Sequence, residues 1–483
     1  MNQAAERLPS FVCGFRHGMN ACFFAVFGNE SPGNRSRYLC YTTDMNNTIG
    51  AIATATGGAL AVIRVSGDEA VSRVNSIFSR DILEARGYTV HYGEILDGRE
   101  TADQVLVTVF RAPKSYTGED MCEISCHGGK YTAEKVLSLL YGAGVIPARR
   151  GEFTERAFLN GKMDLSQAES VNDLVTAKDE VNARSALSGL KGSVRKLLEP
   201  LLESLSQIVA LIEVNIDYPE YDDVEQLSEE ELLPRVNAWI EEISRLIEKA
   251  EAAVTVRNGL NTVLAGRPNV GKSSLLNALL EEDKAIVTDI AGTTRDVVEG
   301  TVRIDDITLH LYDTAGIRES SDTIEAIGIE KSRKALAKAD LVIVVIDANE
   351  GITPEDQDLL DLTEGYPRIV VYNKKDQKDT GDELSISALN HDIEPLIQRI
   401  RKMYAEGILA SKEDTLNNSR QIGLARSARE SMMEVRKSLE NGDEIDLVTV
   451  DLQNAWYALK EITGETGRED LLDEIFSRFC LGK

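Results

Sequence analysis

The sequence predicts a mixed fold, α/β plus all-α, in which an α+β domain precedes a helical domain that is split by an inserted α/β domain. Three observations lead to this prediction. Apolar runs of strand length lie at 60–66, 104–110 and 121–125. Apolar residues then recur at helical spacing through 164–257 and again through 418–479. Between these two helical blocks, a strand pattern ends in a glycine-containing loop that opens a new helix.

The length and composition limit the number of domains and the classes of function that the chain can have. A chain of 483 residues is long enough for two or three domains. Its 80 acidic and 53 basic residues give a net charge of −27, which argues against a protein whose whole surface binds polyanions, although a local basic patch can still bind RNA. The sequence has no apolar run of the roughly 20 residues that span a bilayer, so no contact with a membrane is expected. The six cysteines show neither metal-ligand spacing nor a disulfide framework, which predicts a reducing, cytoplasmic location.

Residues 1–44 differ from the rest of the chain. They hold three of the six cysteines and show no periodic pattern. Arg16 and His17 interrupt the apolar stretch that a secretory signal would need, and Glu6 and Glu30 do not fit a transit peptide well. We expect an atypical extension that is disordered or not translated, with Met45 as the start of the protein.

Residues 45–162 are predicted to form the α+β domain, with a helix over 130–142 after the strands. Arg64 and Glu123 lie in two of its strands, and each strand is followed by a tight turn, Ser66-Gly67 or His127-Gly-Gly129. A polar residue beside such a turn hints at the edge of a ligand site.

The stretch 149–162 is the densest mixture of polar and aromatic residues outside the inserted domain. It either forms a connector in which Thr154 caps a short helix, or presents Arg156 and Lys162 to an anion. Periodicity alone does not choose between these two interpretations.

Residues 163–257 and 407–483 are predicted to be the two parts of the helical domain. An antiparallel bundle needs partners for each apolar face, so we expect the two parts to pack together. Residues 258–406 are then an inserted domain on two tethers, an arrangement that suits a mobile module.

The inserted domain begins with a phosphate-binding loop. Gly266-Arg-Pro-Asn-Val-Gly-Lys-Ser-Ser274 follows a strand pattern at 262–265 and opens a helix pattern at 275–280. The glycines let successive backbone amides converge on phosphates, and the N-terminus of the helix favours negative charge. Lys272 is expected to reach the β- and γ-phosphates and the Ser273 hydroxyl to bind Mg²⁺.

Four further motifs follow in the order that a GTPase needs. The stretch 288–296 supplies hydroxyls, with Thr294 as a second Mg²⁺ ligand, and 313–316 supplies a carboxylate and an amide for the metal and the γ-phosphate. In the stretch 373–376, the Asp376 carboxylate can accept two hydrogen bonds from guanine that adenine cannot donate, and 387–389 closes on the guanine carbonyl. The predicted GTP-binding residues are Asn269, Val270, Gly271, Lys272, Ser273, Ser274, Thr288, Asp289, Ile290, Ala291, Gly292, Thr293, Thr294, Asp313, Thr314, Ala315, Gly316, Asn373, Lys374, Asp376, Ser387 and Ala388.

These motifs resemble those of the TrmE (MnmE) family of tRNA uridine-modification GTPases. The likeness runs from about Thr48 to the last residue, and its most specific parts are 151–169 and the terminal Phe-Cys-Leu-Gly-Lys of 479–483. It implies an N-terminal folate-binding dimerisation domain, a discontinuous helical domain and an inserted Ras-like GTPase. It also implies a homodimer that forms a heterotetramer with a flavoprotein similar to MnmG, an FAD protein. Together they would place a carboxymethylaminomethyl or aminomethyl group on the wobble uridine of tRNA. The residues that match folate-binding positions, for 5-formyltetrahydrofolate or a related tetrahydrofolate, are Arg64, Glu123, Lys162 and Lys483.

Two places depart from the pattern of the family. The turn 54–59 is short and lacks a proline, which affects the edge of the predicted folate site. Leu389 stands where a long basic residue is common, which loosens the predicted guanine site.

The predicted route of hydrolysis differs from that of Ras. Ile317 occupies the position of the glutamine that orients water in Ras-like enzymes, and its side chain cannot form a hydrogen bond. The resemblance implies a K⁺ ion instead, which would offset negative charge in the transition state. It also implies that Glu325 organises the water, the alternative being an ordinary solvated glutamate. The K⁺ ligands implied are the Asn269 side chain and oxygens of Thr288, Ile290 and Thr293.

Two questions stay open at this stage. Cys480 is a nucleophile helped by a neighbouring positive charge, part of the wall of a folate pocket, or a residue that only packs. The alternative function is a ribosome-assembly or signalling GTPase switch without tRNA-modifying activity, which would have no reason to bind folate.

Overall fold

The computed structural model describes residues 47–217, 229–281, 300–313, 336, 338–378, 381, 384–442, 445–466, 472 and 475–482. The predicted extension, 1–44, lies outside these described residues. Among the described residues, no helix is both long and apolar enough to cross a membrane.

The first sheet has six strands in the order β3-β4-β5-β2-β1-β6. Its elements are β1 (Ile49–Ile52), β2 (Leu60–Ser66), α1 (Ala70–Asn75), β3 (Thr89–Asp97), β4 (Glu100–Phe110), β5 (Met121–His127), α2 (Lys130–Gly142) and β6 (Ile146–Pro147). The strands and helix predicted at 60–66, 104–110, 121–125 and 130–142 are therefore confirmed, each to within a few residues.

The two faces of this sheet differ because side chains alternate along each strand. Ile63, Val107 and Ile124 point to one face, where they pack with residues of α1 and α2 in a common core. On the other face, Leu60 and Leu106 are exposed. The antiparallel register of β2 and β5 sets Arg64 directly opposite Glu123 on this open face.

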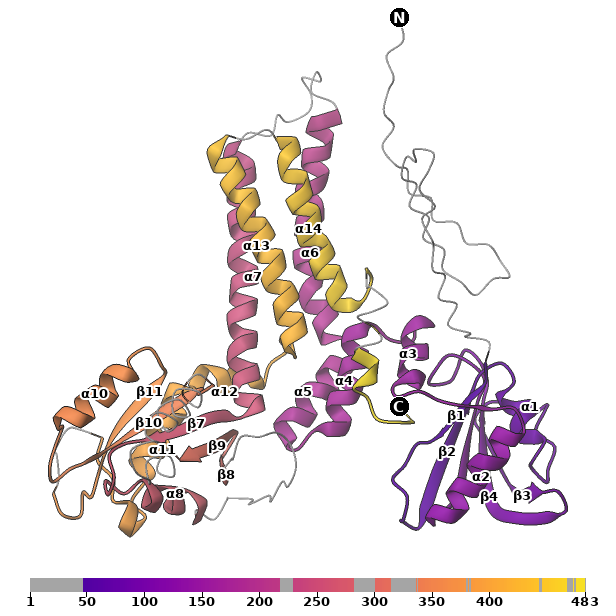
Figure 1. The fold of residues 1–483 in the computed structure, drawn as a ribbon. Coiled ribbons are helices and arrows are strands. Elements are labelled where there is room, and N and C mark those ends of the chain that lie inside the picture. The colour runs from indigo at the N-terminus through magenta and orange to yellow at the C-terminus, as the bar shows by residue number, and fades with distance from the viewer. Residues whose placement is uncertain are drawn as a thin grey trace, which may run out of the picture. The chain divides into compact units, whose positions relative to one another are not determined.

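The helical part of the chain consists of α3 (Glu152–Leu159), α4 (Leu165–Thr176), α5 (Glu180–Leu190), α6 (Ser193–Asp217), α7 (Glu229–Asn258), α13 (Ser419–Asn441) and α14 (Ile445–Thr463). Helices α6, α7, α13 and α14 run side by side (Figure 1). They share one core, in which Leu198, Trp239, Met432 and Leu452 are buried. The prediction that two helical blocks distant in sequence pack together is thus confirmed.

The part of the chain between α7 and α13 forms a five-stranded sheet with its strands in the order β11-β10-β7-β9-β8. Its strands are parallel except for β8, which pairs antiparallel with β9. The elements are β7 (Leu260–Ala265), α8 (Lys272–Glu281), β8 (Gly300–Ile304), β9 (Ile307–Asp313), β10 (Leu341–Asp347), α10 (Pro354–Leu362), β11 (Arg368–Asn373), the 3₁₀ helix η2 (Ala388–Asn390), α11 (Glu394–Met403) and α12 (Ala405–Ser411).

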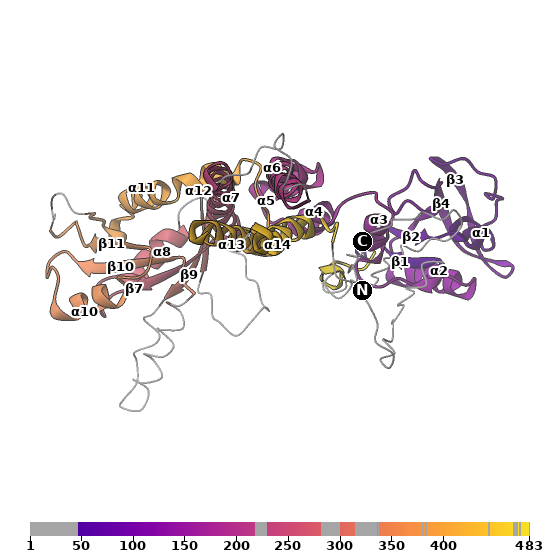
Figure 2. The same ribbon diagram turned by 90° about the horizontal axis from the view of Figure 1, so that it is seen from above.

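Helices cover both faces of this sheet, as expected of a doubly wound α/β fold. Along β10, Ile343 and Val345 pack into a core with α8 and α11, whereas Val342 and Val344 pack into a second core with α10. Figure 2 shows α10 and α11 on opposite sides of the strands. The predicted fold class, α/β plus all-α with an inserted α/β domain, is confirmed.

Candidate functional site

The phosphate-binding loop lies between the end of β7 and the start of α8, as predicted. Both of its glycines have conformations that other residues rarely adopt, with φ of 155° at Gly266 and 97° at Gly271. A Cβ atom at Gly266 would lie 2.5 Å from the Val345 carbonyl oxygen, and one at Gly271 would lie 2.2 Å from Asn373 Nδ2. The neighbouring chain therefore leaves room for glycine alone at both positions.

The side chain of Lys272 binds the backbone at the start of the same loop. This side chain is buried, and Nζ donates to the carbonyl oxygens of Gly266 and Arg267, each at 2.8 Å. Ser273 and Ser274 follow on the first turn of α8 and are exposed. Exposed hydroxyls beside a helix N-terminus and a lysine form an arrangement that binds phosphate groups and a cation.

Asn269 occupies the outer tip of the loop. Its φ of 66° is in the left-handed region, which asparagine tolerates better than most residues, and it is exposed. Val270, next in the chain, is buried. The backbone thus directs one residue of the loop into the core and the preceding one into solvent.

The side chain of Asn373 connects the loop to the predicted guanine site. Its Nδ2 donates to the Val270 carbonyl oxygen at 2.9 Å, and its Oδ1 accepts from the Ala388 backbone N–H at 3.0 Å. Ser387 Oγ donates to Asp376 Oδ1 at 2.5 Å. These contacts bring Asn373, Asp376, Ser387 and Ala388 together at the carboxyl ends of β10 and β11, the edge at which parallel sheets bind ligands.

Asp347 is a residue of this site that sequence reasoning missed. It ends β10, and its Oδ2 accepts from Lys374 Nζ at 2.6 Å, which holds Lys374 in its left-handed conformation with φ of 69°. The signal was present in the sequence: an aspartate directly follows the continuous apolar run of a strand buried on both faces. Leu389, where a basic residue was expected, is 73% exposed.

Several predicted residues fall outside the described part of the chain. They are Thr288, Asp289, Ile290, Ala291, Gly292, Thr293, Thr294, Thr314, Ala315, Gly316, Ile317, Glu325 and Lys483. Asp313 ends β9, where its backbone lies opposite Leu264 of β7. The described residues contain no group of three His, Cys, Asp or Glu side chains that could hold a metal ion.

A second group of polar residues lies on the open face of the first sheet. Arg64 donates from Nε and Nη2 to Glu123 Oε1, at 2.9 and 2.7 Å. The guanidinium also lies over two aromatic rings, 5.2 Å from the centre of Tyr116 and 5.6 Å from that of Phe153. The arginine and the glutamate predicted to share a site are thus in direct contact.

The segment that leads to Gly482 also contacts this group of residues. Arg64 Nη1 donates to the Gly482 carbonyl oxygen at 3.1 Å. Gly482 has φ of 87°, and a Cβ there would lie 2.6 Å from the Ile52 carbonyl oxygen. Phe476 and Phe479 anchor the segment by packing with Leu165 and Ala168 of α4. Cys480 directly follows the second of these anchors and is exposed.

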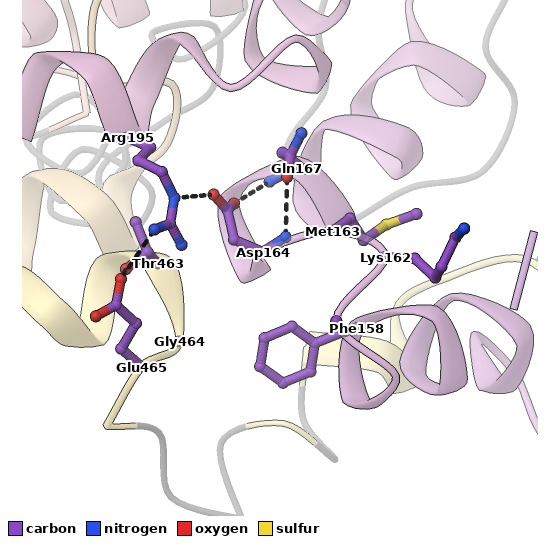
Figure 3. A pocket seen from close by; sticks show the side chains of 10 residues that line it. Phe158, Lys162, Met163, Asp164, Gln167, Arg195, Thr463, Gly464 and Glu465 are labelled. Carbon is purple, nitrogen blue, oxygen red and sulfur yellow. Dashed lines mark hydrogen bonds and ion pairs between the residues drawn. The ribbon is translucent and has the colours of Figure 1, made fainter. Parts of the chain in front are cut away.

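Lys162, the third described residue of the predicted folate site, lines a cavity that Arg64 and Glu123 do not line. Its Nζ donates to the Pro113 carbonyl oxygen at 2.9 Å, and the cavity has a volume of about 450 Å³. Figure 3 shows Arg195 on the opposite side of this cavity, bound to Asp164 at 3.1 Å and to Glu465 at 3.2 Å. The complete lining is Phe158, Gly161, Lys162, Met163, Asp164, Gln167, Arg195, Thr463, Gly464 and Glu465.

Two expectations for the stretch 149–162 are wrong. Thr154 does not cap α3: the cap position is Gly151, and Thr154 is the third residue of the helix, where its buried hydroxyl bonds with the Tyr116 hydroxyl at 2.8 Å. Arg156 is not offered to an anion from solvent, because it is 2% exposed and forms ion pairs with Glu119 and Glu152. Glu119 precedes Arg156 by 37 residues, so local pattern could not reveal that contact.

The two thiols of β5, Cys122 and Cys126, are buried in the core of the first sheet. Burial raises the pKa of the Cys122 thiol to about 12 and that of Cys126 to about 11. At neutral pH both are thiols rather than reactive thiolates.

Comparisons with known proteins agree with this architecture. The model of the GTP-binding protein TrmE N-terminus matches residues 48–162, and that of the MnmE helical domain matches residues 165–480. The tRNA modification GTPase MnmE of Bacillus cereus is 44% identical over 455 residues, which cover 90% of this chain and 99% of the relative. The same enzyme of Lactiplantibacillus plantarum is 44% identical over 461 residues, 92% of this chain and 100% of the relative.

Solved structures match over shorter stretches. Era of Aquifex aeolicus, bound to GDP and aluminium fluoride, is 30% identical over 36% of this chain and 66% of its own, with a TM-score of 0.25. The G domain of the FeoB iron transporter of T. maritima is 31% identical over 30% of this chain and 97% of its own, with a TM-score of 0.22. The resemblance inferred from the motifs is confirmed by the family models and by the full-length relatives: this chain belongs to the MnmE (TrmE) family of tRNA modification GTPases.

Proposed function

We propose that this protein hydrolyses GTP as a component of an enzyme that modifies tRNA. The observation that carries the proposal is the hydrogen-bonded connection through Asn373, which joins the phosphate-binding loop at Val270 to the guanine loop at Ala388. Membership of a family whose relatives are named tRNA modification GTPases supports the second half of the proposal.

The described residues fit GTP and Mg²⁺. The amides at the start of α8 and the ammonium of Lys272 would bind the phosphates, and the hydroxyl of Ser273, an exposed residue, would bind the metal. Bound Mg²⁺ would supply charge neutralisation at the phosphates. Asp376, positioned by Ser387, would accept the two N–H donors of guanine. Thr294 is the proposed second metal ligand.

We also propose that GTP hydrolysis depends on K⁺. The exposed, left-handed Asn269 supports this, because the residue lies at the tip of the loop and is exposed to solvent. Thr288, Ile290 and Thr293 are the other proposed ligands, and Glu325 the residue that orients water. The ion would offset charge that develops on the phosphates.

Hydrolysis should therefore be faster in potassium than in sodium buffer of equal ionic strength, since Na⁺ is too small for ligands spaced for the larger ion. Asn269→Ala should abolish most of this difference, while Asn277→Ala, on the exposed side of α8, should leave it intact. Initial rates of phosphate release give the comparison. Equal rates of the unmodified protein in both salts would disprove the dependence on K⁺.

For the modification centre we propose the open face of the first sheet. Arg64, Glu123, Lys162 and Lys483 would bind a tetrahydrofolate that supplies the one-carbon unit. The contact between Arg64 and Gly482, the residue before Lys483, supports a site shared by the sheet and the end of the chain. The product would be a carboxymethylaminomethyl or aminomethyl group at C5 of the wobble uridine. We propose a cytoplasmic homodimer that acts with an FAD protein similar to MnmG.

Nucleoside analysis of tRNA tests this function directly. Cells that lack the protein should lose the C5 modification at the wobble uridine and regain it when the gene is restored. Unchanged tRNA in the deleted cells would overturn the proposal and favour a GTPase switch. Binding of 5-formyltetrahydrofolate to the purified protein, measured by calorimetry, separates the two functions independently of the cells.

A further inference from the structure

Arg267 is the second residue of the phosphate-binding loop, and its side chain turns away from the nucleotide side toward α10. Its Nε donates to both carboxylate oxygens of Asp356, each at 3.0 Å, and its Nη2 donates to Glu350 Oε2 at 2.8 Å. Asp356 is completely buried, whereas the side chain of Glu350 is 57% exposed. The contact with Asp356 is therefore the one that water screens least.

Asp356 is itself held rigidly at the start of α10. It is the third residue of that helix and forms a capping box with Thr353. The Thr353 hydroxyl donates to Asp356 Oδ2 at 2.8 Å, and the Thr353 backbone N–H donates to the same oxygen at 3.1 Å. The carboxylate that receives Arg267 is thus fixed by the backbone of a helix N-terminus.

The backbone of Arg267, in contrast to its side chain, is bound to the phosphate-binding lysine of the same loop. Its carbonyl oxygen accepts from Lys272 Nζ at 2.8 Å, and it precedes the exposed Asn269 by two residues. The loop is also anchored at Val270 by Asn373. The exposed tip, Pro268 and Asn269, is therefore suspended between an anchor on α10 and an anchor on β11.

We infer that the ion pair between Arg267 and the buried Asp356 is a positioning device that holds the phosphate-binding loop in its nucleotide-binding conformation. This inference rests on the proposed function, since it takes GTP as the ligand. A loop that is already ordered pays less conformational entropy when the nucleotide binds. Loss of the pair weakens binding of GTP and GDP more than it slows the turnover of bound GTP, because Lys272 and Ser273 are unchanged.

Asp356→Asn is the decisive variant, because it keeps the shape of the side chain and removes its charge. Asp358→Asn, an identical change at an exposed position of the same helix, is the matched control. Equilibrium titration of the full-length protein with fluorescent GTP and GDP analogues in Mg²⁺ gives the affinities, and steady-state hydrolysis gives kcat and KM. We expect Asp356→Asn to raise Kd and KM about tenfold, with kcat changed less than about threefold. The control should bind like the unmodified protein.

A double variant separates positioning from stability. Asp356→Asn alone leaves the Arg267 charge without its buried partner and lowers the melting temperature. Arg267→Gln/Asp356→Asn removes both charges and so recovers much of that thermal stability, yet it still lacks the ionic anchor. We expect its affinity for GTP to stay low.

The outcomes are distinct. If either the Asp356→Asn variant or the double variant binds GTP as tightly as the unmodified protein, the positioning role is wrong, and the proposed function is unaffected. An unmodified protein that binds no GTP would overturn the proposed function, and the inference with it. Weak binding by both variants, beside normal binding by Asp358→Asn, supports the positioning role.

Discussion

At the scale of single residues, burial shifts the pKa values of two side chains beside the inserted domain. Arg257, at the end of α7, donates from Nη1 to Asn417 Oδ1 at 3.0 Å and from Nη2 to the Leu416 carbonyl oxygen at 3.2 Å. One guanidinium thus connects the segment that enters the inserted domain with the segment that leaves it. Burial lowers the pKa of Arg257 to about 10 and raises that of the nearby Asp173 to about 6.

The raised pKa of Asp173 predicts a dependence of stability on pH. Because the folded state favours the protonated acid, the stabilising contribution of Asp173 is complete below its ordinary pKa of 3.8 and is lost as pH rises to about 6. The advantage in unfolding free energy of Asp173→Asn over the unmodified protein should therefore grow between pH 4 and pH 6, by about 3 kcal/mol at most, and then stay constant.

Tryptophan fluorescence during urea unfolding measures this difference. Both tryptophans, Trp239 and Trp456, belong to the helical core, so the signal reports that part of the protein. Glu203→Gln, an exposed change on α6, is the control and should show no such growth. A difference that does not change across this pH range would contradict the role of Asp173.

At the scale of elements, the short segment 475–482 combines buried anchors with two exposed residues, Cys480 and Leu481, before the buried Gly482. Phe476 and Phe479 are each 2% exposed. Gly151 packs closely against the backbone of Phe476, because a Cβ atom at Gly151 would lie only 2.5 Å from the Phe476 carbonyl oxygen. Beyond Phe479, the segment continues to Gly482 beside Arg64. A frayed terminus would have neither kind of contact.

Deletion of residues 480–483 tests what this segment does. The aromatic anchors stay in place, so the helical core should keep its stability, and hydrolysis of GTP in the inserted domain should stay nearly normal. Binding of 5-formyltetrahydrofolate should weaken and tRNA modification should be lost. All three activities are measured on the same purified variant, and normal modification after the deletion would remove the segment from the proposed centre.

At the scale of the whole molecule, the inserted domain does not end where its sheet ends. Val256 of α7 is 2% exposed and belongs to the core of the second sheet, together with the partly buried Tyr404 and Ile408. Gly407 of α12 lies against α7, where a Cβ would be 2.8 Å from the Ala252 carbonyl oxygen. The end of α7 and α12 therefore contribute to the folding of the α/β domain as well as flank it.

This arrangement predicts the behaviour of two fragments. Residues 250–411 should unfold at a higher temperature than residues 258–406, the range predicted from the sequence, because the shorter fragment loses the apolar contacts of Val256 and Ile408. Each buried side chain of this size contributes about 1.5–3 kcal/mol. Calorimetric melting of the two fragments, with and without GDP, makes the comparison. Equal melting temperatures of the two fragments would contradict this prediction and would support 258 and 406 as the boundaries of the inserted domain.

Local patterns in the sequence were enough to predict the order of the domains, several of the strands and helices, and the residues of the phosphate-binding loop. These features are local: the alternation of β2, the helical spacing of α2 and α6, and the glycines at 266 and 271 are all properties of short segments. The pairing of the two helical blocks was also predictable, because an amphipathic helix must bury its apolar stripe against another element.

The tertiary structure alone decided which charges meet. Arg156, which one of the two interpretations of its stretch presented to an anion, is buried against Glu119, and Arg267 is bound to Asp356 across 89 residues. The Arg64 guanidinium likewise donates to the Gly482 carbonyl oxygen across 418 residues. A charged residue looks the same in a sequence whether water or a distant carboxylate surrounds it. Hydrophobic periodicity records the face that each element buries, whereas an ion pair depends on the register and packing of several elements at once.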